Sequence, residues 1–452
     1  MRQALIALVV STLPFAAVPA QTGSPAGPVP VDRLAARRDA LAKEIGTGVA
    51  VVRSGVDRSI EGSYPQDSDY REDNDFFYLT GVEVPNSWLV LVASAGRLAE
   101  TILYLPPRDT VSRYRSEQWV GPQFTPGPEA TARTGIRDVR SAERVARELS
   151  ALVFAPESPA RQGSVFVKPG PGQGDSPVLK DTIFALVQAG AGLRIADLAA
   201  PLARLRLVKD ADELVRLRKA IAITEEAQRE AMRRIEPGMY EYQVEAAMEY
   251  VFRRNGAERL GFPSIVGSGP NSTLLHYDKN RRRMEAGDLV VMDIGAEFGY
   301  YTADITRTVP VSGTYTARQR AIYELVLGTQ RAAIEAVRPG VTVQRLDQIA
   351  RDYLRANSAT LCGKVTCERF FVHGIGHWLG MDVHDVGRID TPLAAGMVLT
   401  IEPGVYLSDE RLGVRIEDDV LVTADGHEVL SAGAPKLPDE IETLMRESVT
   451  IP

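Results

Sequence analysis

The sequence predicts an α+β protein of two domains, and three observations carry this prediction. The chain has 452 residues, which is more than one ordinary hydrophobic core accommodates. The N-terminal part alternates short apolar runs with a helical pattern, which is typical of an α/β domain. The C-terminal part groups helices and antiparallel strands in blocks, which favours an α+β domain. We therefore expect a smaller α/β domain over residues 32–200 and an α+β domain over residues 201–452.

The composition is that of a globular protein. Hydrophobic residues make up 44% of the chain and charged residues 25%, with both signs interspersed and a formal net charge of -7. Such a chain presents no broad basic face. We therefore expect no nucleic-acid partner.

Residues 1–20 have the pattern of a cleaved secretory signal peptide. Arg2 supplies the positive start, and a largely apolar stretch, Ala4–Ala17, precedes small residues at the expected cleavage point. A membrane anchor is the alternative, but Pro14 and Pro19 interrupt the stretch and it is short for a bilayer. We expect a secreted or periplasmic protein without a stable membrane anchor.

The N-terminal domain is expected to follow a linker at residues 21–31, which is rich in Pro and Gly and has too few apolar residues to pack. Apolar runs then predict three strands, and helical spacing predicts one helix. A Gly/Pro-rich loop lies at Lys168–Pro177. The expected elements are the strands Val49–Arg53, Trp88–Ala93 and Thr101–Leu105 and the helix Ser141–Leu152.

The C-terminal domain is expected to begin with a helix whose start is well marked. Asp210 can cap it, and Glu213 lies three residues on, as a capping box requires. Leu217 and Ile221 then continue on one helical face. Two further helices are expected over residues 240–256 and 317–337.

Two strand-like runs of this domain are expected to pair as a β-hairpin that turns at Phe298-Gly299. In that register Asp293 faces Asp304, and like charges directly opposed on a sheet are destabilising unless something positive lies between them. Two solvated acids are the alternative, which the apolar run Leu289–Met292 disfavours because it indicates burial. The strand-like runs are Asp288–Glu297, Tyr301–Pro310, Met397–Ile401 and Gly413–Val422.

Four of the five histidines fall in the C-terminal half among acidic residues. Imidazoles concentrated beside carboxylates are ligands that suit a divalent cation. Taken singly, each of these residues could be an ordinary core or surface side chain, and only the set predicts a metal site. The set comprises His276, His373, His377 and His384 with Asp293, Asp304, Asp382, Glu402 and Glu417.

The spacing of His373 and His377 is a poor match to a zinc-protease helix. Gly374 stands where such a helix carries its catalytic glutamate, and glycine also disfavours the helix itself. One histidine as a metal ligand and the other as a substrate contact is the more economical interpretation. Downstream, Arg415 and Glu417 fall on the same side of an expected strand.

The two cysteines, Cys362 and Cys367, lie close together in the sequence. Outside the reducing cytosol they can pair and stiffen the approach to His373. Two free thiols are the alternative, because spacing alone does not fix the geometry of a disulfide. A structural zinc site is disfavoured, because it needs a second pair of ligands.

Five acidic or imidazole positions stand in characteristic short motifs. Asp293 precedes Asp304 by eleven residues, His377 lies in HGIGHWLGMDVHDVG, Glu402 in TIEPG and Glu417 in VRIEDD. Together they resemble the five ligands of the dinuclear pita-bread metallopeptidases, specifically aminopeptidase P and prolidase. The upstream stretch Asp69–Leu91 resembles the N-terminal domain of the same proline peptidases. The resemblance extends from about residue 32 to Arg446.

The resemblance implies a pita-bread catalytic domain that holds two divalent metal ions. Asp293 would bind one ion, His377 and Glu402 the other, and Asp304 and Glu417 would bridge both. Two such ions, about 3.5–4 Å apart, can share a water, lower its pKa and supply hydroxide to attack a peptide carbonyl. Manganese is the ion that the resemblance favours, and zinc and cobalt also tolerate this ligand set.

The resemblance also implies catalytic and substrate-binding roles. Glu402 would pass a proton to the leaving nitrogen, and His276, His373 and His384 would contact the substrate or the tetrahedral intermediate. Arg415 would order the site or meet a substrate carboxylate. The chain departs from several relatives at position 262, where Phe262 replaces a tyrosine.

We therefore expect an exported Xaa-Pro aminopeptidase, a metal-dependent hydrolase acting on peptides with proline at the second position. A prolidase restricted to dipeptides is the closest alternative. A non-catalytic binding module on the same fold is disfavoured, because all five ligand positions are filled. Methionine aminopeptidases lack this N-terminal domain. Relatives often form dimers or tetramers, so we expect a homodimer or homotetramer.

Overall fold

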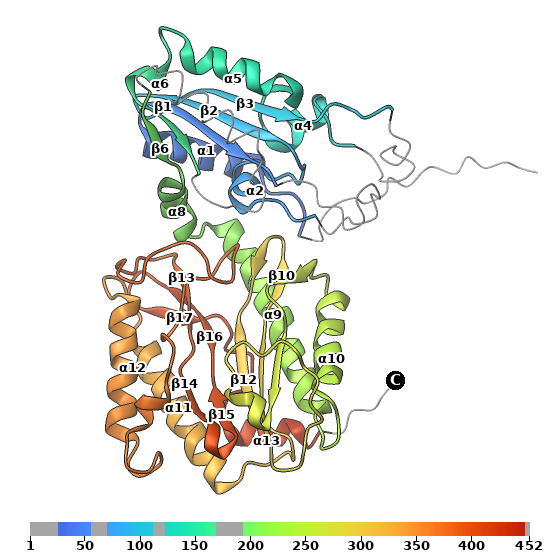
Figure 1. The fold of residues 1–452 in the computed structure, drawn as a ribbon, viewed down its shortest axis with the longest axis vertical. Helices are drawn as coiled ribbons and strands as arrows, with labels where there is room; N and C mark the ends of the chain where they lie inside the picture. The colour runs from blue at the N-terminus through green and yellow to red at the C-terminus, as the bar shows by residue number, and fades with distance from the viewer. Residues whose placement is uncertain (1–25, 56–69, 112–122, 169–192, 448–452) are drawn as a thin grey trace, which may run out of the picture.

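A computed structural model of the protein describes residues 26–55, 70–111, 123–168 and 193–447. Figure 1 shows two units, an N-terminal one and a C-terminal one, with helix α8 (Ala199–Leu207) between them. The expected signal peptide, residues 21–25 of the expected linker and the Gly/Pro-rich loop beyond Lys168 lie outside the described residues. Within the described ranges, none of the helices has the length and hydrophobicity that a membrane span requires.

The N-terminal unit is built on a six-stranded mixed sheet of order β4-β3-β2-β1-β5-β6. Strands β1, β2 and β3 pair antiparallel, whereas β4, β5 and β6 join parallel to their neighbours. The strands are β1 (Gly48–Arg53), β2 (Trp88–Ser94), β3 (Arg97–Leu105), β4 (Asp138–Ser141), β5 (Ser164–Val167) and β6 (Ile195–Asp197). The helices are α1 (Val31–Ile45), α2 (Asn74–Thr80), α4 (Pro128–Thr134), α5 (Val145–Phe154) and α6 (Pro159–Gln162).

Both faces of this sheet are buried, as the period of two along β1 shows. Val49 and Val51 pack on one side with α5, whereas Ala50 and Val52 belong to the core on the other side, with α1 and α2. The second core continues without a break into the C-terminal unit. The two units therefore share buried apolar surface.

The C-terminal unit places helices outside short antiparallel sheets, so the predicted α+β class is confirmed. Helix α9 packs on α10 at one side, and α11 packs on α12 at the other (Figure 1). The sheets have the orders β11-β10-β7, β12-β9-β8, β13-β16-β17 and β14-β15. The helices are α9 (Ala211–Arg234), α10 (Glu241–Arg254), α11 (Ala317–Glu335), α12 (Val343–Asn357) and α13 (Pro438–Met445). The strands are β7 (Arg259–Leu260), β8 (Ile265–Ser268), β9 (Leu289–Ile294), β10 (Ala296–Phe298), β11 (Tyr301–Thr302), β12 (Ile305–Pro310), β13 (Val398–Ile401), β14 (Gly404–Leu407), β15 (Leu412–Arg415), β16 (Asp418–Val422) and β17 (His427–Val429).

The predicted capping box at the start of α9 is confirmed. The Asp210 side chain accepts hydrogen bonds from the backbone N–H groups of Asp212 and Glu213, and the Glu213 side chain accepts from the Asp210 N–H. Leu217 and Ile221 are buried on the inner face of this helix. The start of the C-terminal unit is thus fixed by local sequence.

The predicted β-hairpin forms, but its turn lies one residue later in the chain than predicted. The predicted register of the two strands is therefore wrong. Phe298 pairs with Tyr301, so the turn is Gly299-Tyr300, and both turn residues have positive φ (58° and 75°). This is the backbone of a two-residue type I′ hairpin turn. Asp293 consequently pairs with Thr306 and lies diagonal to Asp304. The predicted turn had Gly299 at its second position. In the structure Tyr300 occupies the second position, because its side chain contacts the N-terminal unit.

Three other expected boundaries need correction. The expected strand over residues 413–422 is two strands, β15 and β16, which separate at Ile416 and Glu417. The expected helix from Ser141 begins with a 3-10 turn, and α5 starts at Val145. The expected linker, residues 21–31, overlaps the first residue of α1, which begins at Val31 directly after Pro30. The cysteines, for which sequence left two alternatives, form a disulfide between Cys362 and Cys367.

Candidate active site

The acidic candidates stand where strands end or break. Asp293 lies near the end of β9, Asp304 between β11 and β12, Glu402 directly after β13, and Glu417 between β15 and β16. His377 lies on the loop between the 3-10 turn Cys367–Phe370 and β13. At Asp304, Glu402 and Glu417 the strands are interrupted, which leaves room for side chains to converge.

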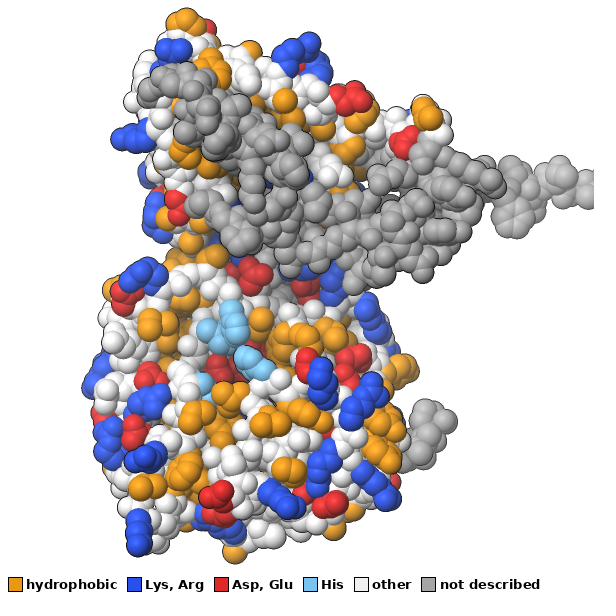
Figure 2. Space-filling model, in the orientation of Figure 1, with side chains coloured by type: hydrophobic (Ala, Val, Ile, Leu, Met, Phe, Trp, Pro, Cys, Tyr) orange, Lys and Arg blue, Asp and Glu red, His pale blue; other side chains and the backbone are white. Residues whose placement is uncertain are grey.

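These five side chains line one cavity of about 270 Å³ in the C-terminal unit. His276 and His384 line it too, together with the apolar side chains of Phe262 and Val383. Figure 2 shows histidine and acidic side chains gathered in a hollow of the C-terminal unit, on the side facing the N-terminal unit. The cavity therefore combines charged groups with an apolar wall.

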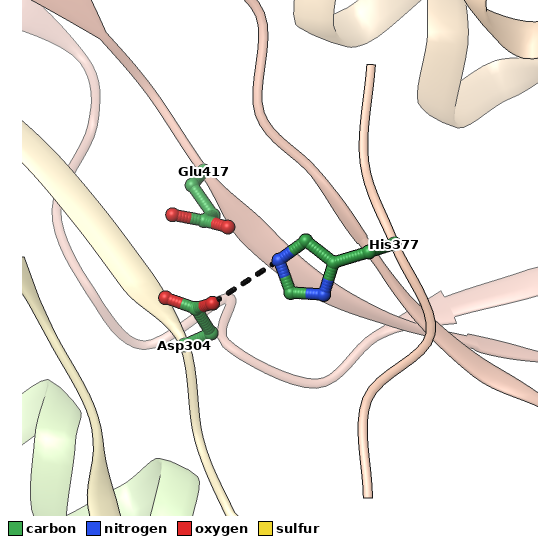
Figure 3. Close-up of side chains that lie close together, drawn as sticks. All are labelled: Asp304, His377 and Glu417. Carbon is green, nitrogen blue, oxygen red and sulfur yellow. Dashed lines mark ion pairs between the residues drawn. The ribbon is translucent and has the colours of Figure 1, made fainter. Parts of the chain in front are cut away.

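Asp304, His377 and Glu417 form the most compact part of the cluster (Figure 3). One potential ligand atom from each lies within 4.8 Å of the other two. His377 Nε2 is 3.4 Å from Asp304 Oδ2 and 3.4 Å from Glu402 Oε1. Asp293 lines the same cavity but is turned toward Arg415, whose Nη2 is 2.6 Å from Asp293 Oδ2.

The clustered acids are electrostatically unfavourable without a cation. Burial, and then the neighbouring Asp293, raises the pKa of Asp304 well above its ordinary value. Burial, and then Asp304, does the same to the pKa of Glu417, and burial also raises the pKa of Glu402. Mutual repulsion of buried carboxylates is the cause that acts on Asp304 and Glu417 beyond desolvation.

The donor atoms fit divalent metal ions. Asp293 Oδ1 and Asp304 Oδ1 are buried, yet no hydrogen-bond donor among the described residues reaches them. A buried carboxylate oxygen without a donor is costly, and a cation satisfies it. Carboxylate oxygens with one imidazole suit manganese, zinc or cobalt ions.

The tautomer of His377 also favours metal binding. Its Nδ1 lies 3.1 Å from the carbonyl oxygen of Trp378, which can only accept a hydrogen bond. Nδ1 therefore carries the proton in the neutral ring, and the Nε2 lone pair points toward Asp304 and Glu402. An imidazole fixed in this way presents one free ligand atom.

His373 and Arg415 lie beside the cavity and are joined by a residue that the sequence did not single out. His373 Nδ1 donates to the Gly374 carbonyl (2.9 Å), so its Nε2 accepts from the Tyr406 hydroxyl (2.8 Å). Arg415 Nη1 donates to the same hydroxyl at 3.1 Å. Burial, and then Arg415, lowers the pKa of His373 to about 4. His373 Nδ1 is also 3.7 Å from Glu402 Oε2.

Two more supporting residues were missed from sequence. Thr306 donates to Glu417 Oε2 (2.6 Å) and accepts from Arg415 Nε (3.1 Å). Asp419 accepts from the backbone N–H of Asp304 at 3.2 Å. The period of two offered a weak signal for both, because Thr306 follows Asp304 and Asp419 follows Glu417 by two residues.

The remaining sequence candidate, Asp382, is half exposed and does not line the cavity. It pairs with Arg206 of helix α8 at 3.0 Å. The structure thus brings seven of the predicted site residues to the cavity, and His373 and Arg415 reach it through Glu402 and Asp293.

Comparison with known proteins identifies similar chains along nearly the whole sequence. The family described as "Aminopeptidase P, N-terminal domain" matches residues 34–158, and "Metallopeptidase family M24" matches residues 215–424. The Xaa-Pro aminopeptidase of Escherichia coli K12 is 33% identical over 441 residues, which cover 90% of this chain and 96% of that protein. The Xaa-Pro dipeptidase of Pyrococcus furiosus is 41% identical over 226 residues, or 49% of this chain and 62% of that protein.

Solved structures agree with these matches. A putative aminopeptidase P from Bacillus anthracis superposes with a TM-score of 0.84 and 29% identity, covering 94% of this chain and all (100%) of that one. E. coli aminopeptidase P with the inhibitor Pro-Leu superposes with a TM-score of 0.80 and 31% identity, covering 93% of this chain and 99% of that one.

Proposed function

The chain belongs to the aminopeptidase P family of M24 metallopeptidases, and from this we propose that it is an exported enzyme that removes the N-terminal residue from peptides with proline at the second position. The observation that carries the proposal is the single cavity in which four buried or half-buried carboxylates meet an imidazole with a free Nε2. Such a donor set is suited to hold divalent ions that activate water for hydrolysis.

We assign the two divalent ions to the five cavity residues as the resemblance to the family implies. Asp293 would hold one ion, His377 and Glu402 the other, and Asp304 and Glu417, at the centre of the cluster, would contact both. When bound, a pair of divalent ions lowers the pKa of water and polarises the substrate carbonyl. The acid-rich donor set supports manganese, which prefers oxygen ligands.

The protein's own groups then bind the substrate and move the proton. Glu402 lies on the cavity wall, so its carboxylate is placed to carry a proton to the leaving nitrogen. His276 and His384 line the cavity and can donate to a developing negative charge. His373 stays neutral and is held by Gly374 and Tyr406, with its Nδ1 3.7 Å from Glu402 Oε2. Arg415 orients Asp293 and, through Tyr406, His373.

Export is supported by two features. The first 20 residues have the pattern of a signal peptide. The Cys362–Cys367 disulfide belongs to the class of bonds that persist in oxidising compartments. We therefore place the mature enzyme outside the cytosol, in the periplasm or the medium, and we expect a homodimer or homotetramer there.

A peptide substrate longer than a dipeptide is supported by the extent of the similarity. The similarity to the E. coli Xaa-Pro aminopeptidase covers 90% of this chain, whereas the similarity to the P. furiosus Xaa-Pro dipeptidase covers 49%. We therefore rank the prolidase activity second.

The decisive experiment is a kinetic series on Ala-Pro, Ala-Pro-Ala and Ala-Pro-Ala-Ala, with Ala-Ala-Ala as the control peptide. We expect the purified enzyme to release alanine from the tripeptide and tetrapeptide when manganese is supplied. Treatment with a chelator should abolish release, and manganese should restore it. Cleavage of the dipeptide alone would identify a prolidase, and no cleavage at any metal loading would support a binding module.

A further inference from the structure

The cavity residue His384 lies on a loop that is fixed from behind by a buried group of charges. Its neighbour Asp385 has a side chain that is only 1% exposed. Arg206 Nη2 donates to Asp385 Oδ1 at 2.6 Å, and Lys209 Nζ donates to Asp385 Oδ2 at 3.0 Å. His384 itself points the other way, and its ring lies 4.3 Å from the ring of His377, centroid to centroid.

Arg206 links this loop to the N-terminal unit. It belongs to α8, which lies between the two units (Figure 1), and its side chain is 3% exposed. Its Nη1 donates to Asp75 of α2 at 2.8 Å, while its Nη2 also reaches Asp382 at 3.0 Å. One guanidinium therefore contacts the N-terminal unit and two acids on either side of His384.

Two other residues of the N-terminal unit reach the same loop. Arg71 Nη2 donates to the carbonyl oxygen of Met381 at 2.9 Å, and Asn74 Nδ2 approaches that oxygen at 3.4 Å. Arg71 also pairs with Glu297 of β10 at 2.8 Å. The loop thus rests on a surface made by residues 70–75, in addition to the Arg206 contact.

The loop has little freedom to adopt another conformation. A Cβ added at Gly380 would lie 2.1 Å from Asp385 Oδ2, so the carboxylate sits directly against the backbone. The Gly380 carbonyl accepts from the Thr302 N–H at 3.0 Å, and the Asp385 N–H donates to the Trp378 carbonyl at 2.9 Å. Without Arg206, Asp385 would keep Lys209 but lose the shorter of its two ion pairs, which is costly for a buried carboxylate. Loss of Arg206 would therefore move Asp385, and His384 with it.

We propose that Arg206 is a positioning residue, which acts through Asp385 to hold His384 at the cavity wall, so that the N-terminal unit is part of the active-site apparatus. This inference rests on the proposed peptidase function. It gives the N-terminal unit a chemical role that is separate from stability and from oligomer formation.

A double-mutant cycle between Arg206→Lys and His384→Ala tests the proposal, with kcat/KM for Ala-Pro-Ala measured on the manganese-loaded enzyme. Lysine keeps the charge and loses the two-sided contact. We expect Arg206→Lys to lower kcat/KM about tenfold in the wild-type background and less than about twofold in the His384→Ala background, because coupled residues are not additive. Equal losses in both backgrounds, or no effect of His384→Ala, would overturn it.

Arg37→Lys is the matched control. Arg37 is also a buried arginine (6% exposed) that joins the two units, but its partners are Asp210, Glu213 and the Tyr78 carbonyl. We expect Arg37→Lys to lower the melting temperature and to leave kcat/KM per folded molecule unchanged. A loss of kcat/KM equal to that of Arg206→Lys would assign the effect to general destabilisation.

A second variant and a second measurement keep the test independent of activity. Asp75→Asn removes the negative charge that pairs with Arg206 and Lys168 without a change of shape, and hydrogen exchange of residues 380–387 reports the order of the loop directly. We expect faster exchange there in Asp75→Asn and Arg206→Lys, and not in Arg37→Lys. If the wild-type enzyme fails to cleave Ala-Pro-Ala, the proposed function fails, and the exchange result still decides the inference: unchanged exchange overturns it.

Discussion

At the scale of single residues, the site is built from buried acids whose negative charges repel one another. This repulsion favours the binding of cations. Asp304 lies among Asp293, Glu402 and Asp419, all of which raise its pKa beyond the effect of burial. Arg415 offsets part of this charge, because it pairs with Asp293 at 2.6 Å. The remaining negative charge is what makes the cavity selective for multivalent cations.

Asp304→Ala should abolish turnover and preserve the fold. The substitution removes an oxygen ligand from the centre of the cluster, and losing even an indirect metal contact commonly costs about 10–100-fold. We therefore expect kcat/KM to fall by more than about a hundredfold, with an unchanged circular dichroism spectrum. The exposed Asp409→Ala serves as the control. Retention of activity by the Asp304 variant would remove this residue from the metal site.

The pH dependence of stability should carry the signature of His373. Its pKa falls from an ordinary 6.5 to about 4 in the folded protein, because it is buried and lies near Arg415. The folded state then binds fewer protons than the unfolded state between about pH 6.5 and 4. Stability should therefore be lost as the pH falls through this window, by up to about 1.4 kcal/mol per pH unit.

Denaturant unfolding of wild type and His373→Gln at several pH values measures this loss. The variant should show a flatter decline between about pH 6.5 and 4. Parallel curves for wild type and His373→Gln would contradict the assignment.

At the scale of elements, the hairpin of β10 and β11 decides where the acids lie. Its turn at Gly299-Tyr300 sets the register that pairs Asp293 with Thr306. Thr306 in turn donates to Glu417, so the register also fixes a ligand on another strand. One turn thus determines the relative position of acids that are far apart in the sequence.

Gly299→Ala should destabilise the protein through this turn. Gly299 has a φ of 58°, and an added Cβ would lie 2.6 Å from Arg216 Nη1. We expect a loss of more than about 1–2 kcal/mol, which is the usual cost of the left-handed conformation alone. Gly313→Ala is the control, because Gly313 shares the positive φ (77°) and has open space around it. Urea unfolding gives the free energy of unfolding of both variants. Gly313→Ala reports the backbone strain alone, so an equal loss of stability in the two variants would exclude the steric conflict at Gly299.

At the scale of the whole molecule, the two units behave as one framework around the cavity. Tyr300, at the hairpin turn, stacks on Phe77 of α2 with ring centroids 3.7 Å apart, and the Arg71 guanidinium lies over the Tyr300 ring, 4.8 Å from its centroid. The Tyr300 hydroxyl accepts from the Glu72 N–H at 2.9 Å and donates to Glu83. The N-terminal unit therefore holds both the hairpin and the His384 loop.

Tyr300→Ala should uncouple the two units. The side chain is 5% exposed, and truncation of a buried aromatic residue costs about 3–5 kcal/mol. We expect a lower melting temperature and a broadened or divided calorimetric transition, because the units then unfold less cooperatively. Tyr250→Ala, at a position that is 60% exposed, should have little effect. A single transition at the wild-type temperature would contradict a shared framework.

The sequence by itself determined the local features of this protein. The Asp210 capping box, the apolar strands and the existence of the hairpin follow from residue patterns over a few positions, which depend on neighbouring backbone and side-chain chemistry. The motifs around Asp293, His377, Glu402 and Glu417 indicated a metallopeptidase, because these residue types in these surroundings suit divalent ions.

Only the tertiary structure decided the register of the hairpin, the supporting roles of Thr306 and Tyr406, and the link from Arg206 to the His384 loop. The reason is physical. Tyr300 adopts a positive φ because partners from residues more than 200 positions away, such as Glu83, stabilise it. Arg206 reaches Asp75 and Asp385 across 131 and 179 residues. Contacts over such separations depend on how whole units pack, and no short sequence pattern encodes that packing.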